Sequence, residues 1–198
     1  MSRLPSHPLE YLKAYKEKCI SALEAISESD VALLISLLEG ARDSGRQIFL
    51  CGNGGSASTA SHLANDLGKG ASQGRDCRFR VLSLTDNVSW ITALANDSDY
   101  SEIFVEQLKN FAQPQDLLLV FSGSGNSPNV IRSVEWANQN ELVTIGVTGR
   151  PGGQLASKAQ HTLFVESSHM GHIEEGHFLI QHLLGYYFME GGRSDEAP

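Results

Sequence analysis

The sequence has no excess of positive charge and no long apolar run, and each of these shortages excludes a class of protein. The net charge of -8 argues against general nucleic-acid binding, because such binding needs a basic surface that displaces counterions. No apolar segment approaches the roughly 20 residues that a membrane-spanning helix requires. We therefore expect neither nucleic acid nor a membrane as a partner. The charged segment 1–18 also predicts that no signal peptide is present.

Cysteine is scarce as well. The three cysteines, Cys19, Cys51 and Cys77, lack the spacing of a metal-binding motif and leave one residue unpaired. We interpret them as reduced thiols and predict a cytoplasmic location. Cys51 closes a short apolar segment, so we expect it at the end of a buried strand.

No internal repeat, low-complexity tract or linker divides the 198 residues, a length that fits one domain. Apolar residues recur three to four positions apart over 8–44, which predicts two helices that end at Gly45. We expect an N-terminal helical arm over 1–45, which covers the sheet or pairs with another subunit. A single compact domain over 46–190 and a flexible tail over 191–198 are expected to follow.

Short apolar segments alternate with helical patterns after the arm. The predicted strands are 47–51, 79–84, 116–121, 142–147 and 162–165. The predicted helices lie near 56–68, 88–95, 100–111, 127–139, 152–158 and 172–189. This order predicts an α/β fold with a doubly wound, five-stranded parallel sheet flanked by helices. Such sheets bind ligands outside the carboxyl ends of their strands, so the loops that follow the strands are the informative ones.

Two Gly- and Ser-rich loops have the chemistry of anion binding. The first is Gly52-Asn53-Gly54-Gly55-Ser56, and the second is Ser122-Gly123-Ser124-Gly125-Asn126-Ser127. Glycines let the backbone approach an anion, and each loop leads into a helix with free N–H groups. Either loop alone could be an ordinary turn in which Ser56 or Ser127 caps a helix. Two such loops at one edge of a sheet favour a phosphate site.

The first loop also satisfies a rival pattern, because Gly52-x-Gly54-x-x-Ala57 matches the dinucleotide-binding fingerprint. That fingerprint requires an acidic residue about 20 positions later, at the end of the second strand. The nearest candidate, Asp86, lies more than thirty residues after the loop begins. The Ser-rich second loop has no role in that scheme, so a dinucleotide site is the less favoured alternative.

Histidines and acids occur on two of the predicted helices. His62 and Asp66 are four residues apart and therefore share a helix face. In the late helix His177 falls on the apolar stripe, which predicts a packed core residue, whereas Glu174, Gln181 and His182 lie on a neighbouring face that could look toward a pocket. The ordinary interpretation of these groups is a solvated ion pair and an acidic first helical turn. Convergence on the two loops would instead make an acid–base or metal site.

The two loops and the two His/acid helices resemble the sugar isomerase (SIS) domain and, within it, the phosphoheptose isomerases. The segments that carry the resemblance are, in order, GNGGS, LANDSDY, SGSGNSPNVI, VTGRPGG and IEEGH. They span nearly the whole chain. The resemblance implies a flavodoxin-like SIS fold. It also implies an aldose–ketose isomerase that converts sedoheptulose 7-phosphate to glycero-manno-heptose 7-phosphate through an enediolate.

The resemblance also implies roles for single residues. Substrate and phosphate would be bound by Asn53, Gly54, Gly55, Ser56, Asn96, Asp97, Ser122, Gly123, Ser124 and Ser127. A divalent metal would be held by His62, Asp66, Glu174 and His182. Two histidines and two carboxylates suit zinc, and also manganese or iron. Either carboxylate would remove the carbon-bound proton and His182 would shuttle a proton on the other side. The implied assembly is a homotetramer with active sites at subunit interfaces.

Three positions depart from the usual residues of that family. Asp66 stands where a Glu is usual, which withdraws the carboxylate by about 1.5 Å. Glu174 stands where a Gln is usual, and Gly123 replaces the Thr of a Ser-Thr-Ser turn. The departures leave open an isomerase of another ketose phosphate. They also leave open a non-catalytic SIS adaptor or sensor that binds a phosphosugar or a replication-initiator protein.

The spacing of the late helix limits a shared metal site. Eight residues separate Glu174 from His182, a rise of about 12 Å on a straight helix. Two ligands of one zinc ion need donor atoms within about 4 Å of each other, because each bond is near 2 Å. We therefore predict either a helix that is irregular near Glu174 or a site with ligands from two chains.

Overall fold

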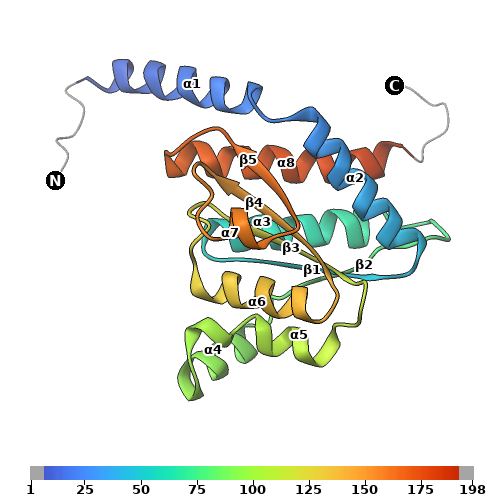
Figure 1. The fold of residues 1–198 in the computed structure, drawn as a ribbon. Coiled ribbons are helices and arrows are strands. Elements are labelled where there is room, and N and C mark those ends of the chain that lie inside the picture. Colours follow the sequence, from blue (N-terminus) through green and yellow to red (C-terminus); the bar gives the residue numbers. More distant parts are fainter. Residues whose placement is uncertain (1–6, 192–198) are drawn as a thin grey trace.

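Five short apolar segments pair into one parallel sheet in the computed structural model, which describes residues 7–191 (Figure 1). The strands are β1 (Gln47–Gly52), β2 (Arg80–Ser83), β3 (Leu117–Ser122), β4 (Val143–Gly149) and β5 (His161–Val165). Their order in the sheet is β2-β1-β3-β4-β5, and every neighbouring pair is parallel. The predicted doubly wound α/β fold is therefore confirmed.

The helical patterns also form helices. These are α1 (Pro8–Glu24), α2 (Glu28–Asp43), α3 (Gly55–Asn65), α4 (Val88–Asp97), α5 (Val105–Phe111), α6 (Pro128–Gln139), α7 (Leu155–Lys158) and α8 (Met170–Glu190). A π-helical turn, η1 (Asp66–Gly70), continues α3, and a short 3-10 helix, η2 (Tyr100–Glu102), precedes α5. The predicted single helix over 100–111 is thus divided into η2 and α5. No described helix is long and apolar enough to cross a membrane.

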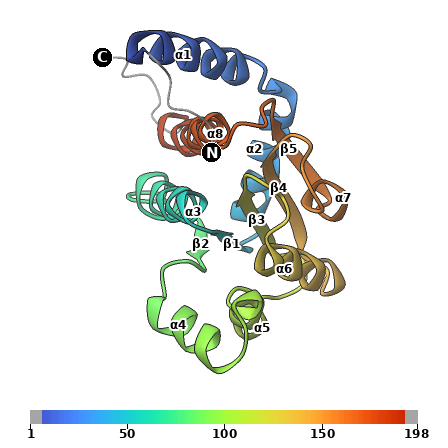
Figure 2. The ribbon, with the colours of Figure 1, turned by 90° about the vertical axis from the view of Figure 1, so that its left-hand side faces the viewer.

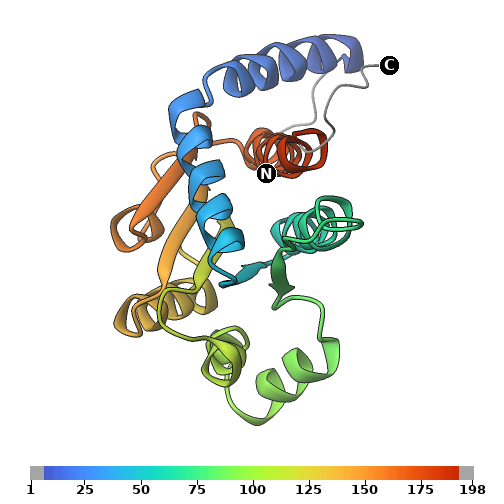
Figure 3. The ribbon, with the colours of Figure 1, turned by 90° about the vertical axis from the view of Figure 1, so that its right-hand side faces the viewer.

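The helices form two layers around the sheet (Figures 2 and 3). Alternate residues of a strand point to opposite faces, so each strand contributes to both cores. Leu50 and Leu119 pack with α2, α3 and α8, whereas Phe49 and Leu118 pack with α5, α6 and α7. The central strands are buried on both faces, which explains their almost continuous apolar sequence.

The strand order places the two Gly- and Ser-rich loops side by side. β1 and β3 are neighbours, and Gly52 at the end of β1 is paired with Phe121 near the end of β3. The chain leaves β1 toward α3 on one face and leaves β3 toward α6 on the other face. Parallel sheets with this order bind ligands at such a switch point. Both loops therefore lie at the edge where the fold favours a ligand.

The two N-terminal helices have different surroundings. Val31, Leu34 and Leu38 of α2 are buried in the core on one face of the sheet. In α1 only Ala22 is buried, and the helix runs along α8 at the margin of the molecule (Figure 1). Of the predicted arm over 1–45, α1 is the part that projects. The predicted flexible tail lies outside the described residues, apart from Gly191.

Candidate active site

The first loop turns sharply from β1 into α3. Gly54 has a φ of +54°, a left-handed conformation that favours glycine. α3 begins at Gly55, and Ser56 lies buried in its first turn without serving as the N-cap. The N–H groups of Ser56 and Ala57 donate to backbone carbonyls of the turn at 3.0 Å, so this terminus offers an anion the positive end of the α3 dipole.

The side chain of Asn53 connects the first loop to two other elements. It exchanges two hydrogen bonds with Asn129 at the start of α6, at 2.9 and 2.8 Å, and accepts a third, 3.1 Å long, from the Tyr100 hydroxyl. Asn129 is buried and Tyr100 belongs to η2. Sequence reasoning assigned no role to Asn129 or Tyr100. The available signal was their place inside the SGSGNSPNVI and LANDSDY segments.

The second loop is held by its own hydroxyl groups. Ser122 is buried and its Oγ accepts from the Gly125 N–H at 3.2 Å, while Ser124 Oγ accepts from the Asn126 N–H at 3.2 Å. Gly123 lies between them, against the side chain of Met170. Ser127 occupies the N-cap position of α6, yet its hydroxyl makes no capping bond in the described part of the chain. The alternative in which Ser127 serves as an ordinary N-cap would require such a bond.

Asn96 and Asp97, which the resemblance assigns to the substrate site, lie at the end of α4. Both are exposed at the end of α4, and Asn96 donates to Asp97 at 2.7 Å. Within the described residues neither side chain forms a hydrogen bond to either loop. α4 buries no residue and lies away from the sheet beyond α5 (Figure 2). Tyr100 is the residue of this region that reaches the first loop.

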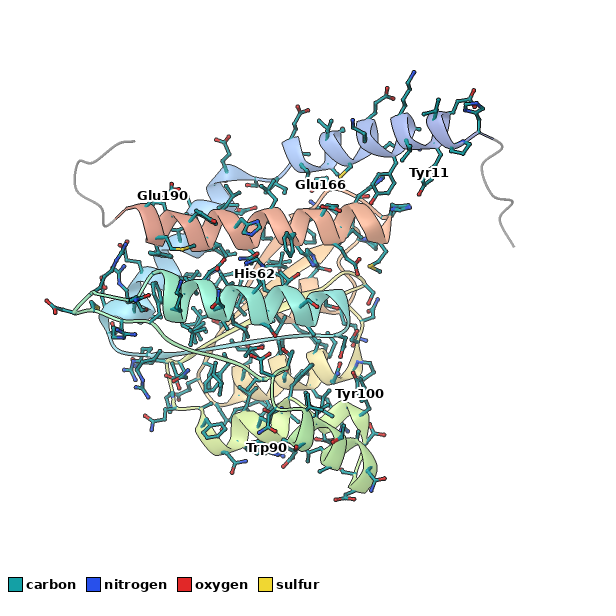
Figure 4. All side chains as sticks on the ribbon, turned by 180° about the vertical axis from the view of Figure 1, so that it is seen from behind. Tyr11, His62, Trp90, Tyr100, Glu166 and Glu190 are labelled. Atoms are coloured by element: carbon teal, nitrogen blue, oxygen red, sulfur yellow. The ribbon has the colours of Figure 1, made fainter. Side chains whose placement is uncertain are left out.

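His62, Asp66 and His182 form the one group of metal-binding side chains found among residues 7–191, with donor atoms within 4.8 Å of one another. His62 comes from α3 where this helix faces α8 (Figure 4), and its Nε2 lies 3.5 Å from Asp66 Oδ2. The rings of His62 and His182 are nearly perpendicular, with centroids 5.0 Å apart. Both rings are half-buried and Asp66 is buried.

Asp66 lies where α3 changes into the π-helical turn η1. Its carbonyl oxygen accepts from the Ala71 N–H at 2.7 Å, the i+5 bond of a π turn. Such turns insert one residue into a helix and are frequent at functional sites. The helix that carries the His/Asp group is thus irregular at Asp66.

Glu174 is not part of this group within one chain, which differs from the implied four-ligand set. A Cβ atom placed on Gly55 would lie 2.9 Å from Glu174 Oε1, so this carboxylate packs against the first loop. α8 is a continuous α-helix from Met170 to Glu190, so of the two predicted alternatives the irregular helix near Glu174 is excluded, and a site with ligands from two chains stays a prediction. A straight helix separates Glu174 and His182 by about 12 Å, which explains why they reach different places.

Two buried groups near the site are neutral. His177 is fully buried on α8, and burial lowers its pKa to about 4. Neither of its ring nitrogens has a hydrogen-bond partner among the described residues. The prediction of a core histidine is confirmed. Burial raises the pKa of the Cys51 thiol to about 12, and the predicted position at the end of a buried strand is also confirmed.

The donor set fits a divalent transition metal. Two imidazole nitrogens and one carboxylate oxygen are common ligands of zinc, and three protein ligands leave a position open for substrate. The 4.8 Å spread of donor atoms is slightly wider than the limit of about 4 Å set by bonds near 2 Å.

These features define a class of sugar-phosphate-binding domain, because two anion-type loops at the switch point adjoin a His/Asp group. The model of the SIS domain family matches residues 10–149. A phosphoheptose isomerase of Helicobacter pylori is 37% identical over 174 residues, which cover 86% of this chain and 88% of that relative.

Solved structures agree with the sequence comparison. Phosphoheptose isomerases from Francisella tularensis and Neisseria gonorrhoeae superpose with a TM-score of 0.84 each, at 29% and 28% identity. Each match covers 92% of this chain and 98% of the other. The chain belongs to the SIS domain family and, within it, to the phosphoheptose isomerases, which are aldose–ketose isomerases. The dinucleotide alternative is not supported, because the chain belongs to this family of sugar isomerases.

Proposed function

We propose that this enzyme interconverts sedoheptulose 7-phosphate and glycero-manno-heptose 7-phosphate. The observation that carries the proposal is the joint position of two phosphate-type loops, the Glu174 carboxylate and the His62/Asp66/His182 group along α3 and α8. The names of the relatives support the same reaction class. Aldose–ketose isomerisation needs a base and a means of stabilising an enediolate, and the site offers both.

The phosphate group is proposed to bind between the two loops. The positive dipole ends of α3 and α6 lie at these loops, and Ser124 and Ser127 add hydroxyl groups near the second helix. Helix termini stabilise an anion without any cationic side chain. The net charge of -8 therefore does not prevent binding of a phosphorylated sugar.

We infer that His62, Asp66 and His182 hold a divalent metal, most simply zinc. When bound, such an ion would polarise the oxygens of the sugar and stabilise negative charge that develops on them. His182 belongs to this group by geometry, so we assign it to the metal and not to a proton shuttle. The chelator arm of the experiment below tests this assignment.

Glu174 is the proposed general base of this chain, at a position where the family usually carries Gln, so its base would differ from that of such relatives. Its carboxylate lies against the Gly54–Gly55 turn where substrate would enter, whereas Asp66 faces α8 and is engaged by Gln181. Glu174 would accept the proton from the hydroxyl-bearing carbon beside the carbonyl and return it to the former carbonyl carbon, while the hydroxyl proton of the first carbon passes to the former carbonyl oxygen within the enediol. Sequence reasoning left both carboxylates open for this role, and their positions favour Glu174.

A homotetramer with interfacial active sites is also proposed, on the evidence of an exposed apolar face. Four large side chains of α8 are exposed beside His182, namely Phe178, Leu183, Tyr186 and Tyr187. A cavity of about 420 Å³ between α2 and α8 includes His182 in its lining. Contact along this face would bury the apolar surface and enclose the metal site.

A cytoplasmic location is supported by the state of the cysteines. Cys19, Cys51 and Cys77 are all free thiols. Free thiols are typical of proteins in a reducing compartment.

The central experiment incubates the purified protein with sedoheptulose 7-phosphate in deuterated water and follows the aldose product by NMR. We expect turnover with deuterium incorporated at the carbon that exchanges its proton, and loss of turnover after treatment with a chelator. Unphosphorylated sedoheptulose is the matched control and should not react. A pentulose phosphate and a hexulose phosphate test the substrate, and inertness toward all of them would favour the adaptor instead.

A further inference from the structure

Gln181 makes the shortest contact to the acid of the His/Asp group. Its Nε2 donates to Asp66 Oδ2 at 2.5 Å, and both side chains are buried. The bond joins α8 to the end of α3 across 115 positions of sequence. The same Oδ2 atom lies 3.5 Å from His62 Nε2, so one carboxylate oxygen faces both the imidazole and the amide.

The next turn of α8 closes the space around this carboxylate. A Cβ atom on Gly185 would lie 3.0 Å from Asp66 Cβ and 3.1 Å from its Oδ2. Gln181 and Gly185 are one helical turn apart on the same face, so they bracket the acid from the side of α8. The space available fits the short side chain of Asp66 together with the long side chain of Gln181.

Gln181 is not placed there by ordinary packing. Its Oε1 is buried and has no hydrogen-bond partner within residues 7–191, which costs free energy of folding. An apolar residue would avoid that cost at this fully buried position. Packing alone does not require an amide at this position. The short hydrogen bond to Asp66 is the contact that accounts for its presence.

We propose that Gln181 is a positioning residue that orients the Asp66 carboxylate toward His62 and His182, and that the lengths of the two side chains are matched. This inference rests on the proposed metal site. Residues that hydrogen-bond metal ligands fix the orientation of those ligands, and their loss weakens metal binding by about 10- to 100-fold. Gln181 does this from α8 while its neighbour His182 supplies a ligand.

The test measures Co²⁺ affinity of the metal-free protein by competition with a chromophoric chelator, together with isomerase kinetics. Gln181→Met keeps the length and removes the donor. We expect Co²⁺ affinity to fall about 10- to 100-fold and kcat to fall by a similar factor. KM for the sugar phosphate should change less than about threefold, because the phosphate loops are untouched. Should Gln181→Met fail to fold, Gln181→Asn withdraws the same donor by one methylene.

Exchanging the side-chain lengths of residues 66 and 181 distinguishes a positioning role of Gln181 from a purely structural one. Asp66→Glu drives a longer acid into Gln181 and Gly185, and we expect this single variant to lose Co²⁺ affinity. Combining Asp66→Glu with Gln181→Asn keeps the total length and the donor–acceptor pair. The double variant should therefore bind Co²⁺ more tightly than either single variant. If the role of Gln181 is purely structural, the losses of Co²⁺ affinity in the two single variants should add in the double variant.

Ile180→Val is the matched control, since Ile180 is equally buried on α8 and does not bond to Asp66. It should lower Tm without changing Co²⁺ affinity. Unchanged Co²⁺ affinity in Gln181→Met, or a double variant no better than the singles, would overturn the proposal, as would wild-type protein that binds no Co²⁺. Absence of isomerase activity would overturn the proposed function alone, because the Co²⁺ comparison would still decide the role of Gln181.

Discussion

At the scale of the residue, two acids that differ by one methylene lie in different places. Asp66 is buried between α3 and α8 beside two imidazoles, and Glu174 lies against the first loop. These positions are the basis on which we propose Asp66 as a metal ligand and Glu174 as the base. Sequence spacing could place both on suitable helix faces but could not separate these roles.

Glu174→Gln should mainly lower kcat, whereas Asp66→Asn should mainly lower the affinity for Co²⁺. Glu174→Gln removes the proposed base, and we expect kcat to fall by about 10²- to 10⁴-fold with Co²⁺ affinity nearly unchanged. Asp66→Asn should weaken Co²⁺ binding at least about tenfold, since it removes a ligand charge. Kinetics and chelator competition on both variants decide the matter. Full turnover in Glu174→Gln would contradict its assignment as the base.

His177 makes stability depend on pH. Its folded pKa of about 4 is below the ordinary value, so the unfolded chain binds more protons between these values. The contribution of the buried neutral ring is complete above about pH 6.5 and is lost as the pH falls toward 4. We expect about 2 kcal/mol of this loss between pH 7.5 and 5. Urea unfolding of wild type and His177→Leu at several pH values measures this loss. The claim would be refuted if the free energy of unfolding fell equally with pH in both proteins.

At the scale of the element, the pair α3 and α8 carries most of the site. α8 contributes Glu174, Gln181 and His182 from one continuous helix, and η1 lets α3 change its path at Asp66. The two helices lie side by side on one face of the sheet (Figures 2 and 3). Their packing brings together side chains that no local pattern connects.

A single methyl group on α3 tests that packing. Gly55→Ala places a Cβ atom 2.9 Å from Glu174 Oε1, the end of a flexible side chain that can move away. We expect the fold to remain and Tm to be retained, because alanine favours helix, while kcat falls at least about tenfold. Gly40→Ala in α2 is the control, since nothing lies within 4 Å of its Cβ position. Equal activity in both variants would argue against a catalytic Glu174.

At the scale of the whole molecule, two helices expose large apolar side chains. α1 exposes Leu9, Tyr11 and Leu12, and the outer face of α8 exposes Leu183 and Tyr186. Contiguous apolar surface of this kind is typical of subunit interfaces. These exposed side chains are the basis on which we propose that an assembly covers the site next to His182.

Leu183→Glu tests the assembly. A charge in the centre of the exposed α8 face should shift the protein to smaller species in analytical ultracentrifugation and lower activity at least about tenfold. Leu33→Glu is the control, because Leu33 is similarly exposed on the outer side of α2. A wild-type monomer with full activity would rule out the interfacial site.

The sequence by itself determined the parallel sheet, the two loops and the faces of single helices. Strand burial, Gly and Ser turns and helical spacing act over a few residues, so their patterns are readable directly. The tertiary structure alone decided which acid meets which histidine. The bonds of Gln181 to Asp66 and of Asn129 to Asn53 join residues 115 and 76 positions apart. Such contacts depend on how whole helices pack across the sheet, and no local pattern records that packing.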